Sequence, residues 1–225
     1  MQAERRAPLS RDRVLQAAID LADEGGIDSL SMRKLGQALG VEAMSLYNHV
    51  ANKDDLLDGI IDLVLGEVER PSSEEDWETS VWKSVTSFHD VLVRHRWACS
   101  LLMSFPRVRP TRIRYMEALM RCLREAGFSP AMTYHAYHAL DSHILGFTLW
   151  QLGHTMPGSG TPIKTTDDIV RFMAKFLPTV DIDEYPYLLE HAEQHLSDGP
   201  HKTPTEFDFV LRLILDGLKR IRDQT

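Results

Sequence analysis

Residues 31–53 read SMRKLGQALGVEAMSLYNHVANK, and this stretch decides the fold of the chain. Ser31 is placed to cap a first helix by accepting a backbone N–H. Leu35 and Leu39 lie four residues apart, on one face of that helix. Gly40 follows at once and suits the left-handed residue with which many helices end. The stretch therefore begins with a short helix that stops at Gly40.

A second short helix follows the turn, and it is too small and too polar to belong to a core. Leu46 and Val50 are four residues apart and point inward. Two helices joined by a short glycine-containing turn form the helix-turn-helix of DNA-binding proteins, whose second helix enters the major groove. The side chains left for the outer face are Ser45, Tyr47, Asn48 and His49.

The rest of the chain shows helical periodicity and no alternating strand pattern. A helix over 10–24 precedes the motif, and Asn52 caps a further helix over 53–70 that has Asp54 and Asp55 in its positive first turn. Further helices are expected over 72–95, 98–103, 111–126, 130–152, 167–177, 183–197 and from about 203 to 221. The chain is therefore expected to be all-α.

Residues 14–65 resemble the TetR family of bacterial transcriptional regulators. Four strings carry the resemblance: residues 30–35 (LSMRKL), 39–41 (LGV), 45–50 (SLYNHV) and 52–57 (NKDDLL). The resemblance is close over about the first quarter of the chain. The remainder fits the family only in length, helical pattern and a few short strings.

The resemblance implies an N-terminal three-helix helix-turn-helix domain and a larger helical ligand-binding and dimerisation domain. We place the DNA-binding head in residues 1–53, the linking fourth helix in 53–70, and the effector-binding and dimerisation domain in 71–225. A ligand-responsive regulator of double-stranded operator DNA is expected, most simply a repressor released from a palindromic operator. An activator of the same fold is not excluded by the sequence.

The net charge of −8 needs apportioning, because DNA binders are commonly basic. Residues 1–53 hold seven Lys and Arg and seven Asp and Glu, so the remainder carries the whole negative charge. A neutral head binds DNA if its cations share one face, and an acidic remainder limits non-specific binding. The cations expected on that face are Arg5, Arg6, Arg33, Lys34 and Lys53.

Composition also bounds the compartment. No run of 18 apolar residues exists, so no membrane span is expected, and the N-terminus lacks the apolar core of a signal peptide. Cys99 and Cys122 form no motif and are expected to be buried thiols. A cytoplasmic protein without a cofactor follows.

Contacts with DNA divide into base readout and phosphate binding. Arg33 matches a family position that contacts guanine, and arginine pairs bidentately with guanine O6 and N7. Ala43 and Met44 are apolar and suit thymine methyl groups, and Ser45 lies beside them at the start of the recognition helix. The alternative for His49 and Arg33 is a structural or solvated side chain. Asn48 also lies on the outer face that meets DNA. The phosphate contacts expected are Ser31, Tyr47, His49 and Lys53.

The effector site is expected among aromatic and polar residues of the second domain. A pocket usually has an apolar lining with a few convergent polar groups. Glu69 stands where the related tetracycline binders carry a His on the fourth helix, their His and Thr magnesium ligands fall near Phe105 and Val108, and the Glu of their eighth helix falls near Trp150. These replacements remove the magnesium site, so a hydrophobic effector is expected instead of tetracycline. The pocket residues expected are Trp82, Phe88, His89, Phe105, Tyr115, His138, Asp141, Phe147, Trp150 and Gln151.

The spacing His135-x2-His138-x2-Asp141-x-His143 also invites a metal hypothesis, and with it a metal-dependent enzyme as a rival function. No further cluster supplies a fourth ligand, and no nucleophile motif accompanies it, so we expect no metal and no catalysis.

A homodimer is expected, because a single helix-turn-helix contacts few bases. The alternatives are that the apolar stripes face the chain's own core, or that the last helix binds another protein as an adaptor. The stripes are Ala136, Ala139, Leu140, Ile144 and Phe147 in one helix and Phe207, Val210, Leu211, Ile214, Leu215, Leu218 and Ile221 in the other.

Overall fold

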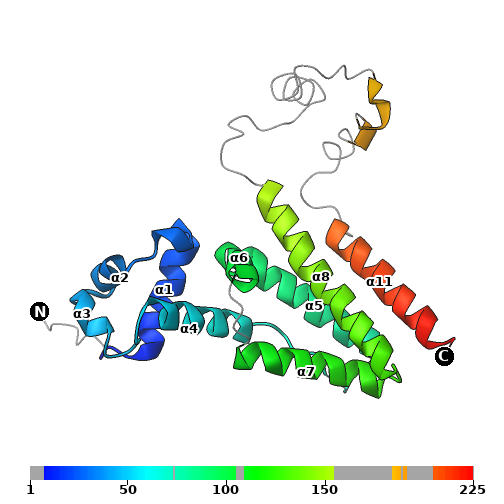
Figure 1. Ribbon diagram of the computed structural model, residues 1–225, viewed down its shortest axis with the longest axis horizontal. Coiled ribbons are helices and arrows are strands. Elements are labelled where there is room, and N and C mark those ends of the chain that lie inside the picture. The colour runs from blue at the N-terminus through cyan, green and yellow to red at the C-terminus, as the bar shows by residue number, and fades with distance from the viewer. Residues whose placement is uncertain are drawn as a thin grey trace, which may run out of the picture. The chain divides into compact units, whose positions relative to one another are not determined.

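The computed structural model describes residues 8–72, 74–104, 109–154, 184–188, 190–191 and 205–224, and among these residues it contains helices and no strand (Figure 1). The all-α prediction is confirmed. The expected helix over 167–177, and all but a few residues of that over 183–197, lie outside the described residues. The helices are α1 (Arg11–Gly25), α2 (Met32–Leu39), α3 (Ala43–Leu46), α4 (Lys53–Gly66), α5 (Trp77–Arg94), α6 (Arg96–Ser104), α7 (Pro110–Glu125), α8 (Pro130–His154) and α11 (Glu206–Arg222), with a short 3-10 turn η1 (Ile27–Ser29).

The chain divides into two compact units, residues 1–153 with 211–225, and residues 154–210. Helices α1 to α7, α8 up to Gly153 and α11 from Leu211 belong to the first unit. None of the described helices is both long enough and apolar enough to cross a lipid bilayer.

Three predicted caps start the helices of the head. The Ser10 hydroxyl accepts from the Arg13 N–H at 3.3 Å, the Ser31 hydroxyl from Lys34 N–H at 3.2 Å, and the Asn52 side chain from Asp55 N–H at 2.9 Å. Each cap satisfies a backbone donor that the first turn leaves unpaired. The apolar face of α1 packs on α2 and α4, and its residues Val14, Leu15, Ala18, Ile19 and Ala22 are buried.

An ion pair fastens the start of α1 to the start of α4. The Arg11 guanidinium binds both carboxylate oxygens of Asp55, at 2.8 and 2.9 Å, and donates to the His49 carbonyl at 2.8 Å. The Arg11 hydrogen bonds, with one from the Ala51 N–H, lower the pKa of Asp55 to about 2. Asp55 therefore does more than complement the helix dipole.

The prediction that α5 begins at Ser72 or Ser73 is wrong, because α5 begins at Trp77. The Asp76 carboxylate is the cap, accepting from the Thr79 N–H at 3.1 Å. Ser72 is instead tied to α5 from outside: its N–H donates to the Ser80 hydroxyl at 2.7 Å, and that hydroxyl donates back to the Ser72 carbonyl at 2.8 Å.

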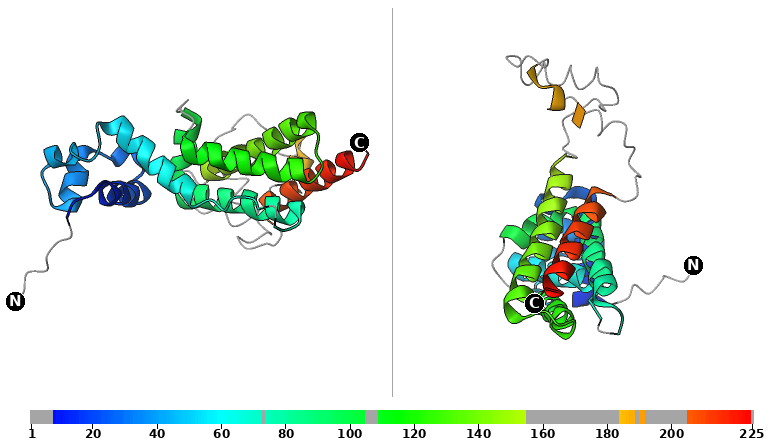
Figure 2. Two further views of the ribbon diagram at one scale, coloured as in Figure 1. Left: turned by 90° about the horizontal axis from the view of Figure 1, so that it is seen from below. Right: turned by 90° about the vertical axis from the view of Figure 1, so that its right-hand side faces the viewer.

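Helix α5 lies among the other helices of the body (Figure 2). Phe88 and Val85 are fully buried, and α5 contacts α4, α6 and α7. On its other side, α11 reaches α5 through the Lys219–Glu78 ion pair at 2.8 Å and through Arg212, whose guanidinium lies 5.3 Å from the Trp82 ring centre. The core of the body is thus assembled around α5.

Replacing Asp55 with asparagine is expected to lower the free energy of unfolding by about 1 kcal/mol at pH 7, because solvent screens a pair whose side chains are 44% and 32% exposed. A carboxyl with a lowered pKa stabilises the fold above its usual value of 3.8, and this contribution is lost as the pH falls toward about 2. Urea unfolding of both proteins from pH 7 to pH 2 measures this, and their difference should vanish at the acid end.

Asp54→Asn is the matched control, since Asp54 is an exposed carboxylate in the same helical turn. A loss from Asp54→Asn as large as that from Asp55→Asn would contradict the assignment.

Candidate nucleic-acid interface and effector site

The turn between α2 and α3 closes tightly at Gly36. The Val41 N–H donates to the Gly36 carbonyl at 2.9 Å, and Gly40 adopts a left-handed φ of 68°. A Cβ on Gly36 would lie 2.9 Å from the Val41 carbonyl oxygen and 3.2 Å from the Ala43 nitrogen. Gly36 is therefore the residue that lets α3 approach α2, and the sequence reasoning missed it because a glycine inside a helix carries no positional signal.

The second helix of the motif is shorter than expected. We expected it to reach Val50, but α3 ends at Leu46 and residues 47–50 form tight turns. The Tyr47, Asn48 and His49 N–H groups bond to carbonyls three residues back rather than four. Leu46 and Val50 are both buried, as expected. The tight turns bring the polar side chains of 47–49 to the end of α3.

The residues expected to read bases differ in exposure. Met44 is the most accessible, at 75%, and Arg33 is also exposed. Ala43 and Ser45 are half-buried, so only part of each side chain lies at the surface. Met44 and Arg33 are thus the side chains with most freedom to reach a groove.

Among the residues expected at phosphates, Ser31, Tyr47 and Lys53 are exposed, as is Asn48 on the outer face. The His49 ring is half-buried and its carbonyl accepts from Arg11, so His49 also supports the fold.

The charge of this surface comes from few groups. Arg33, Lys34 and Lys53 are exposed, whereas Arg5 and Arg6 lie outside the described residues. Asp54 and Asp55 reduce the attraction of the start of α4 for phosphate, although Arg11 neutralises Asp55.

The expected effector residues do not gather in one place, because Phe88 and His89 lie on different sides of α5. Phe88 packs edge-on against Tyr115 of α7, with ring centres 5.0 Å apart. The Arg112 guanidinium lies 4.9 Å from the Phe88 ring centre and forms an ion pair with Asp141 of α8. Phe88, Tyr115 and Asp141 thus share a first cluster, in which Arg112 is the residue that the sequence reasoning missed.

Two polar atoms of this first cluster are buried without a hydrogen-bond partner of ordinary geometry. They are the Arg112 Nη1 and the Tyr115 hydroxyl. Burial raises the pKa of Tyr115 to about 12, so the hydroxyl stays protonated at neutral pH and is a potential donor.

His89 belongs to a second cluster, between α5 and the second half of α8. The Thr148 hydroxyl donates to the Ile144 carbonyl at 2.6 Å and lies 2.8 Å from His89 Nδ1. Because that hydroxyl has one hydrogen, Nδ1 must donate to it, which fixes the tautomer of a neutral ring. The Phe147 ring centre lies 5.9 Å from that of His89. The side-chain oxygen of Gln151 and the Thr86 hydroxyl are buried without partners.

The remaining expected effector residues lie elsewhere or outside the description. Trp82 lies beside α11, and with Glu78, Thr79, Arg212 and Leu215 it lines a cavity of about 270 Å³. His138 is exposed and stacks edge-on with Tyr134, and Trp150 is 46% exposed. Phe105 lies outside the described residues. The expected residues thus fall into two clusters, with the Trp150 ring centre 5.6 Å from that of Phe147 in the second cluster, while Trp82 and His138 lie apart from both.

The spacing of His135, His138, Asp141 and His143 does not form a metal site. His135 and His138 are exposed, His143 is buried, and the Asp141 carboxylate faces Arg112. Within the described residues no group of three or more His, Cys, Asp or Glu side chains is arranged so that it could hold a metal ion. Both cysteines are buried free thiols, as expected, and burial raises the pKa of Cys99 to about 11.

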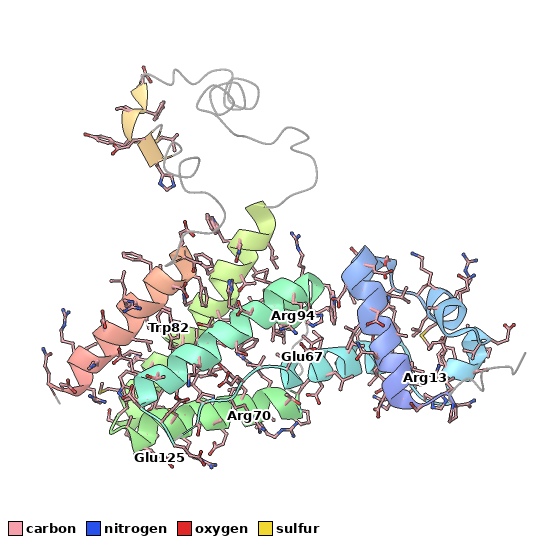
Figure 3. All side chains as sticks on the ribbon, turned by 180° about the vertical axis from the view of Figure 1, so that it is seen from behind. Arg13, Glu67, Arg70, Trp82, Arg94 and Glu125 are labelled. Atoms are coloured by element: carbon pink, nitrogen blue, oxygen red, sulfur yellow. The ribbon has the colours of Figure 1, made fainter. Side chains whose placement is uncertain are left out.

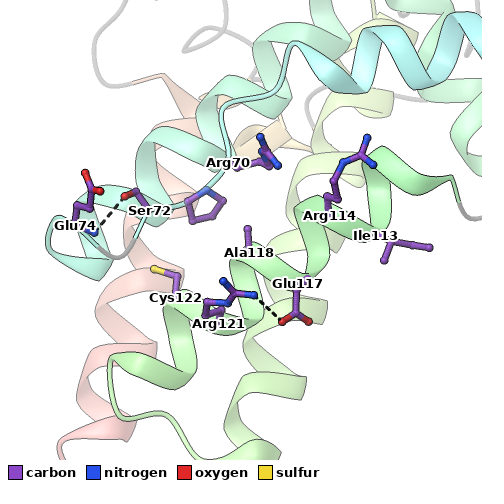
Figure 4. Close-up of a pocket in the computed structure, with 10 residues that line it drawn as sticks. Arg70, Ser72, Glu74, Ile113, Arg114, Glu117, Ala118, Arg121 and Cys122 are labelled. Atoms are coloured by element: carbon purple, nitrogen blue, oxygen red, sulfur yellow. Dashed lines mark hydrogen bonds and ion pairs between the residues drawn. The ribbon is translucent and has the colours of Figure 1, made fainter.

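A larger cavity, of about 490 Å³, lies between residues 70–74 and the outer face of α7 (Figure 4). Arg70, Ile113 and Arg114 contribute to its lining, together with the Glu117–Arg121 pair at 3.3 Å. Its wall mixes charges of both signs, unlike the apolar lining expected of an effector pocket. The surroundings of these side chains in the whole body can be followed in Figure 3.

Comparison with known proteins matches both parts of the chain. Residues 14–60 match the family model of bacterial regulatory proteins, tetR family, and residues 70–222 match the tetracyclin repressor-like C-terminal domain. The tetracycline repressor protein class D of Escherichia coli is 31% identical over 86% of this chain and 89% of its own length.

Two further relatives come from other bacteria. An HTH-type transcriptional regulator of Saccharopolyspora erythraea is 36% identical over 61% of this chain, and the match spans 59% of the relative. The structure of the TetR family protein ActR of Streptomyces coelicolor in complex with actinorhodin is 28% identical, with a TM-score of 0.71, over 96% of this chain and 99% of that one.

Replacing Gly36 with alanine is expected to lower the free energy of unfolding by about 1–3 kcal/mol, because the new Cβ meets backbone atoms that cannot move aside. Gly146→Ala is the control, since a Cβ there meets nothing within 4 Å and alanine favours the helix by about 0.5–1 kcal/mol. Thermal or urea unfolding measures both. Equal effects of the two substitutions would contradict the close approach at Gly36.

Proposed function

Because this chain belongs to the TetR family of helix-turn-helix transcriptional regulators, we propose that it is a homodimeric repressor released from a palindromic operator by a small hydrophobic molecule. The proposal assigns operator binding to residues 1–53, linkage to the fourth helix, and effector binding and dimerisation to 71–225. It implies a protein that works on chromosomal or plasmid DNA in the cytoplasm.

The observation that carries the proposal is the surface of α3. Gly36 and the left-handed Gly40 hold this helix against α2, while Met44 and Tyr47 point to solvent. An exposed methionine on a helix of four residues has no packing role, whereas a helix in a major groove contacts bases with such side chains.

In this proposal Arg33 reads guanine and Met44 with Ala43 packs on thymine methyl groups. Ser45 contacts a base edge beside them. Ser31, Tyr47, Asn48, His49 and Lys53 bind the phosphate backbone and set the register.

Exposed apolar residues on α8 and α11 support a dimer. The predicted stripes themselves mostly face the chain's own core, since only Ala139, Val210 and Ile221 of them are exposed. The buried stripe residues are Ala136, Leu140, Ile144, Phe207, Leu211 and Leu215. Single exposed apolar residues are ordinary on a protein surface, but several on two helices favour an interface. Those exposed are Tyr134, Leu149, Trp150, Phe209, Val210, Leu213 and Ile221.

For the effector we propose the region of the second cluster. His89 and Phe147 supply an aromatic wall, and Thr86 and Gln151 supply buried polar atoms without partners. The His and Thr magnesium ligands of the tetracycline binders fall near Phe105 and Val108, which cannot replace them, so we propose that the effector differs from magnesium–tetracycline.

The fourth helix is the proposed lever between effector and operator. Asp58 of α4 binds Arg109 at 2.6 Å, and Asp62 accepts from the Thr111 N–H at the start of α7 at 3.1 Å. A shift of α7 is therefore passed to α4 and to the head. The effector favours release only by as much as it binds the released conformation more tightly than the DNA-binding conformation, typically about 1–3 kcal/mol.

The first test is selection of binding sites from random duplex DNA in moderate salt. Enrichment of a palindrome with half-sites about one helical turn apart is expected. Failure of a folded dimer to enrich any sequence would overturn the proposal. Transcription from a promoter carrying the site then separates repression from activation.

Arg33→Ala is expected to weaken binding to the selected site by about 1–3 kcal/mol and to relax the base preference at one position. Arg121→Ala removes an arginine from the body and is the control. Uniform weakening by Arg33→Ala on all sequences would assign Arg33 to a phosphate instead of a base.

Gln151→Leu is expected to raise the effector concentration needed to release the operator by about tenfold, because a donor group of the effector loses its acceptor. Binding to the operator without effector should stay unchanged. The measurement is operator release by hits from a library of hydrophobic compounds. Ser142→Ala, an exposed change on α8, is the control. Identical release curves for Gln151→Leu and the unmodified protein would remove Gln151 from the site.

A further inference from the structure

His95 occupies a position where both of its ring nitrogens face carboxylates. It caps the end of α5, and its backbone N–H donates to the Val91 carbonyl at 2.9 Å. The residue is 5% exposed. Its Nδ1 lies 2.9 and 3.0 Å from the two oxygens of Asp23, and its Nε2 lies 3.3 and 3.4 Å from those of Glu67. The ring therefore bridges two acidic residues.

Three helices end at this point. Asp23 lies in the last turn of α1, Glu67 is the cap residue at the end of α4, and His95 itself ends α5. The end of a helix carries partial negative charge, and α1 has no basic residue in its last turn. Two carboxylates and three such ends therefore surround one imidazole.

Other charged groups also reach this junction. Arg94 of α5 forms an ion pair with Glu67, and the Trp97 indole N–H donates to Asp23 at 2.6 Å. α6 begins at Arg96, which is exposed, and its first turn adds partial positive charge. These groups partly offset the negative charge around the ring. The main interactions of the ring are therefore its two hydrogen bonds, to Asp23 and to Glu67.

A neutral imidazole has one donor and one acceptor, whereas an imidazolium donates from both nitrogens. Only the imidazolium satisfies Asp23 and Glu67 together. A neutral ring turns a lone pair toward one of the two carboxylates and loses that bond.

We propose that His95, as an imidazolium, is the positioning residue that holds the end of α1 and the end of α4 on the body. Asp23 belongs to the head, and Glu67 ends the helix proposed above as the lever. A ring that lacks one proton holds the head less firmly. We expect this to change DNA binding, and that expectation rests on the proposed function. Because only the protonated ring bonds both carboxylates, the attachment is expected to be weaker at high pH than at low pH.

The test is urea unfolding of the full chain at pH 5.5 and pH 8. Relative to His95→Gln, the unmodified protein is expected to lose about tenfold in its folding equilibrium constant between these pH values, because only a ring that donates from both nitrogens bonds both carboxylates. Asp23→Asn keeps an acceptor for Trp97 but removes the charge, and it is expected to lose most of this pH dependence. His135→Gln, an exposed histidine on α8, should behave like the unmodified protein.

The same pH dependence in His95→Gln as in the unmodified protein would overturn the proposal. If His95→Gln fails to fold, Asp23→Asn and Glu67→Gln decide, and unchanged pH dependence in both overturns it. Unfolding needs no DNA, so it decides the role of His95 even if no operator is found.

Operator affinity at the two pH values provides the second readout. His95→Gln is expected to lower the pH dependence of binding, whereas an affinity that does not respond to this substitution at either pH overturns the positioning role. His49→Gln separates any titration at the DNA contact from that at the junction.

Discussion

The head depends on how α1 is fastened at its two ends. At the start, Arg11 binds Asp55 of α4, and at the end Asp23 accepts from His95 and Trp97. Between these points α1 packs through apolar side chains, which fix its distance from α2 and α4 but not its position along them. The polar contacts at the ends supply that second constraint. Because α2 packs on α1 and α3 packs on α2, the recognition surface follows wherever α1 is held.

Polar contacts also hold α4, through three acidic residues. Asp55, Asp58 and Asp62 are spaced three and four residues apart, so they lie along one side of the helix. Each is paired with a different partner: Arg11 of α1, Arg109, and the backbone of α7. Part of the net negative charge of the chain therefore serves contacts between helices. The opposite side of α4 is apolar and buried, so the helix is held by packing on one side and by directed bonds on the other.

Local signals in the sequence predicted the helix order, the caps at Ser10, Ser31 and Asn52, and the turn at Gly40, because each depends on residues within a few positions. The wrong start of α5 came from placing the cap at Ser72 or Ser73, whereas Asp76 caps the helix in the structure. The length of α3 depended on how its last residues turn. Arg112 with Asp141, and Asp23 with His95, are separated by 29 and 72 residues, so no periodicity could pair them. For the same reason the sequence could not show that the neighbours Phe88 and His89 lie on different sides of α5, in different clusters.

The burial of both cysteines limits the chemical signals to which this regulator can respond. Oxidants and alkylating agents react with the thiolate, and a thiol whose pKa is about 11 supplies roughly one thiolate in ten thousand at pH 7. Cys99 is also fully enclosed, and burial raises the pKa of Cys122 as well. The thiols of Cys99 and Cys122 are therefore expected to react slowly with peroxide, disulfides and electrophiles in the folded protein. The body is suited to reversible recognition, and it should keep its sensitivity through the redox changes that disable thiol-based sensors.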